Sequence, residues 1–279
     1  MPEEARVYEA DSNIDYMRGL RETVLERGST NFNVSSLYRN KEYTPEDKVL
    51  LYCVIYMPMH LYSSYHLYKT HLMQYRSVIE SKNIVFIDFG CGPLTSGIAF
   101  WAAAEQLNIT YANITYIGFD ISEKMIDMAK KINECGPDGD HTSGERFIKG
   151  WPVFEYNDIL DRLNHIEMGN YDDTLIIFNF SYLLAEETFK GDLHVLINVL
   201  QEAVKENCNY EIWMVYQNVK GFNRNWNKLK RDLPSINFTV PGYPKIVPVK
   251  YKKLMQVGPP DTRPVSYDIL GNRQFFKGV

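Results

Sequence analysis

The stretch Asn83-Ile-Val-Phe-Ile-Asp-Phe-Gly-Cys-Gly-Pro-Leu-Thr-Ser-Gly97 indicates the fold of this chain. Its run 84–87 is apolar and rich in β-branched side chains, which is typical of a strand buried on both faces of a parallel sheet. The turn 90–92 holds two glycines, and Thr95 or Ser96 can cap the helix that follows. Backbone without side chains approaches a ligand closely, so this arrangement favours a nucleotide-type site, although it also fits an ordinary tight turn.

Strands and helices alternate beyond this stretch. The pattern predicts strands at 116–120, 153–156, 174–178 and 211–216, with helices at 98–105, 123–131, 193–206 and 222–231. Such alternation is typical of a doubly wound α/β fold built on a parallel sheet. Two final strands, 236–240 and 247–254, have no helix between them, so they must be antiparallel neighbours or lie apart.

The segment before the glycine turn has helical patterns. One amphipathic helix is predicted over 14–26 and a loop over 31–43. Thr44-Pro-Glu-Asp47 is a strong helix start, and Pro58 should break the helix that follows it. We therefore expect a helical cap or substrate-side region over 1–82, a ligand-binding domain over 83–257, and a C-terminal tail or lid over 258–279.

Composition limits the classes of protein that need consideration. The chain has 279 residues, of which 45% are hydrophobic, and this suffices for a sizeable core. No run approaches the roughly 20 apolar residues of a membrane span, and the first residues lack a signal-peptide pattern. The four cysteines have no metal-ligand spacing, so we expect reduced thiols, a cytoplasmic protein and no metal.

Polar residues stand at the predicted strand ends. Asp88, Asp120, Asp158 and Asn179 each follow a strand-like run. Ligands of doubly wound sheets bind outside the carboxyl ends of the strands, so these side chains should converge in one crevice.

This set of strand ends resembles the class I S-adenosylmethionine-dependent methyltransferases. The first motif of that family, an acid followed by Gly-x-Gly-x-Gly, is matched by Asp88-Phe-Gly-Cys-Gly-Pro-Leu94. The acid closing the second strand is matched by Asp120, the acid after the third by Asp158, and the fourth-strand motif by Phe178-Asn-Phe-Ser-Tyr182. The resemblance spans about residues 83 to 255. It implies a Rossmann-like seven-stranded sheet whose last strand is antiparallel, and S-adenosyl-L-methionine as cofactor.

The resemblance also implies roles for the donor side of the site. The backbone of the turn Gly90, Cys91 and Gly92 would lie against the methionine part of the cofactor, and Asp88 would orient its ammonium group, directly or through water. Asp120 would accept hydrogen bonds from both ribose hydroxyls. Leu94 departs from the family, which often has a third glycine there.

The adenine side is implied by the same resemblance. Asp158 would accept a bond from the adenine amino group, with Ile121 and Ile159 as apolar walls. A nicotinamide-dependent dehydrogenase fits less well, because Thr95 stands where the last glycine of Gly-x-Gly-x-x-Gly is required, and Asp120 lies 30 residues after Gly90 rather than ~20.

Methyl transfer mainly requires positioning of donor and acceptor. The segment from Asn179 to Tyr182 is the best candidate for catalytic contacts with the acceptor. It faintly resembles the Asn-Pro-Pro-Tyr motif of amino-methylating nucleic-acid enzymes, but both prolines are absent. Alternatively, it is a strand end that only touches the cofactor. The sequence identifies no general base.

The sequence favours a nucleophile on RNA or DNA as the methyl acceptor. Residues 220–253 hold nine basic residues and one acid, interleaved with aromatic side chains, which suits RNA or DNA. Alternatively, this is a solvated surface, and the acceptor is a small molecule enclosed by the N-terminal helices. A third alternative is that the protein is a scaffold or regulatory protein that binds the cofactor without transferring a methyl group. The tyrosines of 52–75 could stack on a substrate or pack the helices, and His60, His66 and His71 lack metal-ligand spacing.

Overall fold

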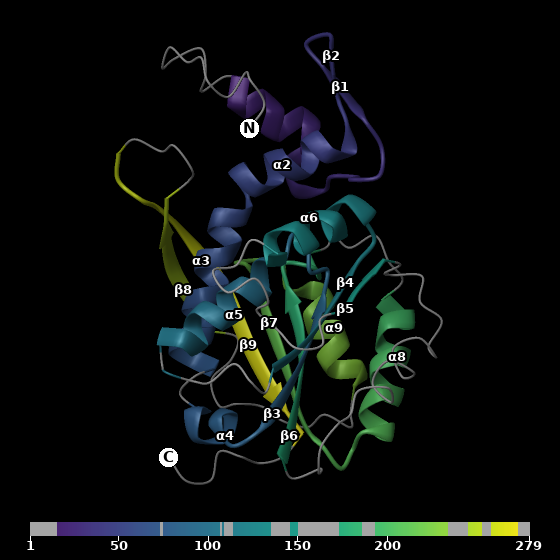
Figure 1. Cartoon of the computed structure of the whole chain (residues 1–279), viewed down its shortest axis with the longest axis vertical. Helices are drawn as coiled ribbons and strands as arrows, with labels where there is room; N and C mark the ends of the chain where they lie inside the picture. The colour runs from purple at the N-terminus through teal and green to yellow at the C-terminus, as the bar shows by residue number, and fades with distance from the viewer. Residues whose placement is uncertain are drawn as a thin grey trace.

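The computed structural model describes residues 16–72, 75–106, 108, 114–134, 146–149, 173–185, 193–233, 245–252 and 258–272. These residues form a central sheet with helices on both faces and a small hairpin unit beyond one end of the sheet (Figure 1). None of the helices in this described part is long and apolar enough to cross a membrane.

The central sheet has seven strands in the order β5-β4-β3-β6-β7-β9-β8. Their bounds are β3 (Asn83–Phe89), β4 (Ile114–Asp120), β5 (Arg146–Lys149), β6 (Thr174–Ser181), β7 (Glu211–Val219), β8 (Lys245–Tyr251) and β9 (Asp261–Gly271). The strands β5, β4, β3, β6 and β7 are mutually parallel, and β9 is antiparallel to both of its neighbours. The strand order reverses between β3 and β6, which is the switch point where doubly wound sheets bind ligands. The predicted Rossmann-like fold is confirmed.

Each face of the sheet carries its own apolar core. The first core contains side chains of α3 (Met57–Leu67), α5 (Thr95–Gln106) and α6 (Glu123–Glu134), and the second those of α8 (Leu193–Glu206) and α9 (Arg224–Asp232). Strand β3 contributes Ile84 and Phe86 to the first core and Val85 and Ile87 to the second. The continuous apolar run of β3 is therefore explained by burial on both faces.

The N-terminal unit lies beyond the carboxyl ends of the parallel strands, next to α6 (Figure 1). Its elements are η2 (Leu20–Val24), η3 (Glu26–Gly28), β1 (Ser36–Tyr38), β2 (Lys41–Tyr43) and α2 (Pro45–Ile55). The capping box of Thr44 and Asp47 is confirmed, and α2 ends just before Pro58, as predicted. The prediction of a loop over 31–43 is wrong, because β1 and β2 form an antiparallel hairpin there.

The predicted domain limits need two corrections. Leu67, Tyr68 and Ile79 belong to the same core as β3, so α3, η4 (Tyr68–Leu72) and α4 (Arg76–Glu80) are part of the sheet domain rather than of a separate region 1–82. Residues 261–271 form β9 inside the sheet, not a tail or lid. The sequence does not predict this strand because it contains Pro264 and the buried Asp268, and prolines and carboxylates are depleted in strands.

One strand position also differs from expectation. The strand beside β4 is β5 (Arg146–Lys149), at residues for which the sequence predicts no strand. Within the described residues, β8 pairs with β9. The predicted strands at 153–156 and 236–240 lie outside the described residues, as do Asp158 and Ile159.

Candidate active site

The turn after β3 is tied to the end of β4. The backbone N–H groups of Gly90 and Cys91 both donate to the carbonyl oxygen of Phe119, at 2.8 and 2.9 Å. Gly90 and Gly92 have φ of +70° and +52°, a region that favours glycine. A Cβ on Gly90 would lie 2.9 Å from Leu183, whereas no atom lies within 4 Å of a Cβ placed on Gly92. The turn therefore leaves open space beside Gly92.

Leu94 adopts the left-handed conformation that a third glycine would take, with φ of +68°. Its side chain is fully buried in the first core, where a Cβ on Gly97 would lie 2.8 Å from it. Burial of the side chain offsets the backbone strain, so the turn is kept without the glycine. The helix α5 begins at Thr95, and the carbonyl of Leu94 accepts from the N–H of Ile98, so the prediction that Thr95 or Ser96 caps this helix is wrong.

Asp120 ends β4 beside this turn. Its Oδ2 accepts the N–H of Gly92 at 3.0 Å, and its Oδ1 accepts the N–H of Ser122 at 2.9 Å. Burial raises the pKa of Asp120 to about 6, although these hydrogen bonds oppose the rise. Each carboxylate oxygen has two lone pairs, so both can accept one further bond. The next residue, Ile121, is 37% exposed and offers an apolar surface beside the carboxylate.

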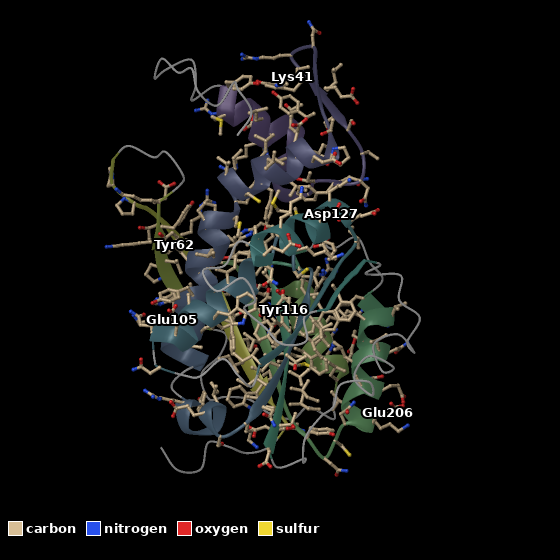
Figure 2. All side chains as sticks on the ribbon, viewed as in Figure 1. Lys41, Tyr62, Glu105, Tyr116, Asp127 and Glu206 are labelled. Atoms are coloured by element: carbon tan, nitrogen blue, oxygen red, sulfur yellow. The ribbon has the colours of Figure 1, made fainter. Side chains whose placement is uncertain are left out.

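Asp88 lies beneath the turn in a buried polar network. Its two oxygens accept the Tyr116 hydroxyl and the Asn179 amide, both at 2.7 Å. Figure 2 shows Tyr116 in the interior of the molecule. Burial raises the pKa of Asp88 to about 7, against the effect of these two donors. The side-chain oxygen Oδ1 of Asn179 also accepts the Tyr68 and Ser181 hydroxyls, both at 3.0 Å.

This network changes the expected role of Asn179. Its side chain is fully buried, and both ends of its amide are already bonded. In this arrangement Asn179 holds β6 against β3 and Asp88 in place, and its side chain is fully buried rather than at the accessible surface.

Tyr182, one residue beyond β6, is held in an unusual conformation. Its φ is +61°, its N–H donates to the carbonyl of Gln217 at 2.9 Å, and its hydroxyl is 2.7 Å from Ser63 Oγ. The ring stacks on His60 with a centroid separation of 3.9 Å. Non-glycine residues in this region of φ cost roughly 1–3 kcal/mol and cluster at functional sites.

His60 is the main residue that the sequence did not indicate. Its Nδ1 lies 2.8 Å from the hydroxyl of Tyr52, and its ring also stacks on Tyr56. Burial lowers the pKa of His60 to about 3, so the imidazole is neutral near pH 7. The available signal was the spacing of Tyr52, Tyr56 and His60 at every fourth position, which puts them on one helical face.

The tyrosine-rich helices therefore meet the strand ends. The carboxylates of Asp88 and Asp120 add to burial in raising the pKa of Tyr52, so Tyr52 lies within electrostatic range of both. The predicted site residues within the described part gather at the carboxyl ends of β3, β4 and β6: Asp88, Gly90, Cys91, Gly92, Asp120, Ile121, Asn179 and Tyr182. Among the described residues, no group of His, Cys, Asp and Glu could hold a metal ion.

Part of the basic segment 220–253 is buried or hydrogen-bonded within the sheet domain. The indole of Trp226 and the ammonium of Lys230 both donate to Asp268 Oδ2, at 2.7 and 2.6 Å. Trp226 is fully buried and Tyr251 is 4% exposed, so neither is free to stack on a base. Lys250 is exposed, but it alternates with Val249, which faces the first core, so it points to the opposite side of β8.

No family model and no curated protein matches the sequence. Solved structures with similar backbones include magnesium protoporphyrin IX methyltransferase from Synechocystis PCC 6803 with bound S-adenosylmethionine, at 9% identity over 95% of this chain and 99% of that one, with a TM-score of 0.40. An S-adenosylmethionine-dependent methyltransferase from Aquifex aeolicus matches at 13% identity over 81% and 98%, with a TM-score of 0.38. TM-scores this low do not establish a relationship. The strand order of this chain shows a Rossmann-like fold, and polar side chains gather at its switch point, where ligands bind in such folds.

Proposed function

We propose that this chain is an S-adenosylmethionine-dependent methyltransferase. The observation that carries the proposal is Asp120: its half-buried carboxylate keeps one acceptor position on each oxygen, next to the open backbone of Gly92. A pair of ribose hydroxyls matches such a carboxylate. The seven-stranded order with its antiparallel β9, and the turn kept at Leu94, support the same assignment.

Residues of this chain fit the donor side of the site. The backbone of Gly90, Cys91 and Gly92 would hold the methionine part, and Ile121 would form an apolar wall. Asp88 would act through Tyr116 and Asn179 rather than at the accessible surface, since it is buried. Asp158 and Ile159 stay proposed for the adenine side. These last two lie outside the described residues.

The bound cofactor would supply an activated methyl group, so the chain has to place an acceptor in line with it. Tyr182 and His60 are the groups proposed for that task, because Tyr182 directly follows β6 and His60, on α3, stacks on its ring. A neutral imidazole with a depressed pKa is a weak base, so His60 is assigned to positioning rather than to proton removal.

A small acceptor is favoured over a nucleic acid. The N-terminal unit lies over the strand ends, where α2 packs against α6 and Lys124 pairs with Glu46 at 2.7 Å. A nucleic-acid acceptor keeps in its favour the exposed cations Arg224, Lys250 and Lys252. Against it stand the burial of Trp226 and Tyr251 and the direction of Lys250.

The test is transfer of a labelled methyl group. Purified protein with methyl-labelled S-adenosylmethionine should label the small-molecule fraction of a cell extract, and Asp120→Ala should abolish labelling. Label confined to RNA or DNA would support the nucleic-acid acceptor instead. Cofactor binding without label in small molecules, nucleic acid or protein would favour a scaffold.

A further inference from the structure

Two polar groups beside Tyr182 are left without a partner in the part of the chain that the structure describes. The first is Nε2 of His60, whose other ring nitrogen is bonded to Tyr52. The second is the guanidinium of Arg263, a half-buried side chain for which no hydrogen bond or ion pair exists in this part. A buried ring nitrogen without a partner is costly, and a half-buried guanidinium without a partner keeps its donors for a ligand.

The sheet register places Arg263 on the acceptor side. Strand β9 is antiparallel to β7, so its first residues lie at the carboxyl ends of the parallel strands. Arg263 pairs with Val249 and is two residues from Val265, and both valines belong to the core beneath α3. Alternation along the strand puts Arg263 on that same face.

Electrostatics agree with this position. Burial raises the pKa of the Tyr182 hydroxyl, and the charge of Arg263 partly opposes the rise, so the guanidinium lies within electrostatic range of that hydroxyl. The nearby cation Arg21 is already engaged, with its Nε donating to Tyr56. Within the described residues, no hydrogen bond or ion pair engages Arg263, which lies within electrostatic range of Tyr182 in the Tyr182–His60 ring pair.

An arginine has a planar fork of donors that matches a carboxylate or a phosphate. The carboxylates of the site do not meet this need, because the hydrogen bonds of Asp88 and Asp120 in the described part go to other donors and none joins either of them to Arg263. We propose that the methyl acceptor is a small molecule with a carboxylate or phosphate that binds Arg263, while its reacting part lies against the Tyr182–His60 ring pair. This inference rests on the proposed function and adds the charge class of the acceptor.

The test divides a cell extract into macromolecules and small molecules, and the small molecules into those that bind an anion-exchange resin and those that do not. Each fraction is incubated with the protein and methyl-labelled S-adenosylmethionine. Label should enter the resin-bound fraction. Arg263→Gln should lower the labelling rate at limiting extract by roughly 10- to 100-fold, the effect of losing a charge-assisted bond, and more extract should restore it, because binding rather than chemistry is weakened.

Matched measurements separate the outcomes. Lys205→Gln removes an exposed cation on α8 and should change nothing. S-adenosylhomocysteine should bind Arg263→Gln as it binds the unaltered chain, measured by calorimetry. Loss of the acceptor after phosphatase treatment would identify a phosphate, and its survival a carboxylate.

Label in the unbound or macromolecular fraction, or full activity of Arg263→Gln, would overturn this inference alone. No label in any fraction, with S-adenosylhomocysteine bound, would overturn the proposed methyl transfer and this inference with it.

Discussion

Replacing Leu94 by alanine or by glycine separates backbone strain from side-chain burial in the turn. Both changes remove a fully buried leucine side chain, which costs about 2–5 kcal/mol of unfolding free energy. Alanine keeps the strain of φ at +68°, about 1–2 kcal/mol, whereas glycine relieves it. The greater conformational freedom of glycine in the unfolded chain reduces this gain in stability by about 0.4–1 kcal/mol. Leu94→Gly should therefore be more stable than Leu94→Ala by up to about 1.6 kcal/mol.

Equilibrium unfolding in urea measures this difference, and Leu200 supplies the matched control. Leu200 is also fully buried but lies within α8, where glycine is about 1 kcal/mol worse than alanine. The order of the alanine and glycine variants should reverse between the two positions. The same order at both positions, with alanine more stable, would refute the argument that Leu94 keeps a strained glycine turn through burial.

Three further predictions concern the site. Burial raises the pKa of Asp88 to about 7, against ~3.9 in the unfolded chain, so protonation of Asp88 stabilises the fold. This stabilisation is at most about 4 kcal/mol. It is complete below pH ~4 and is lost as the pH rises through about 7. Asp88→Asn should show a smaller decline in unfolding free energy between pH ~5 and ~8, and an unchanged decline would contradict the assignment. His60→Phe keeps the ring stack but leaves the Tyr52 hydroxyl unpaired, so stability should fall by about 1–3 kcal/mol with unchanged S-adenosylhomocysteine binding by calorimetry; weakened binding would place His60 on the donor side. Changing Lys250 and Lys252 to Glu should leave methyl transfer intact, and a salt-sensitive loss of transfer would favour a nucleic-acid acceptor.

Local signals made the turn after β3 and the acid at the end of β4 predictable. Short stretches of sequence contain the apolar strand β3, the glycine turn and the acid at Asp120. Local backbone geometry alone determines which residue types occur in these stretches. The capping box at Thr44 was predictable for the same reason, since both partners lie three residues apart. Leu94 departs from the glycine pattern of the motif. Gly97, which has no side chain, leaves room for the buried Leu94 side chain, and this contact is apparent only from the packing of the turn on the helix.

The remaining features depend on contacts between distant residues. Trp226 and Asp268 are 42 positions apart, and their hydrogen bond explains both a buried tryptophan in a basic segment and a carboxylate inside β9. Asn179 on β6 donates to Asp88 on the neighbouring strand β3, a bond that the order of residues along the chain does not indicate. The stack of His60 on Tyr182 joins α3 to the end of β6, and no local pattern encodes it.

The most direct test of the central claim is a calorimetric titration of S-adenosylhomocysteine into the unaltered chain and into Asp120→Asn. Asparagine keeps the shape of the side chain but loses the charge that two ribose hydroxyls would share, worth roughly 1.5–3 kcal/mol. We predict saturable binding to the unaltered chain and an affinity lower by roughly 10- to 150-fold in Asp120→Asn. No binding to the unaltered chain, or equal affinity in both, would contradict the assignment of a donor site at the ends of β3 and β4.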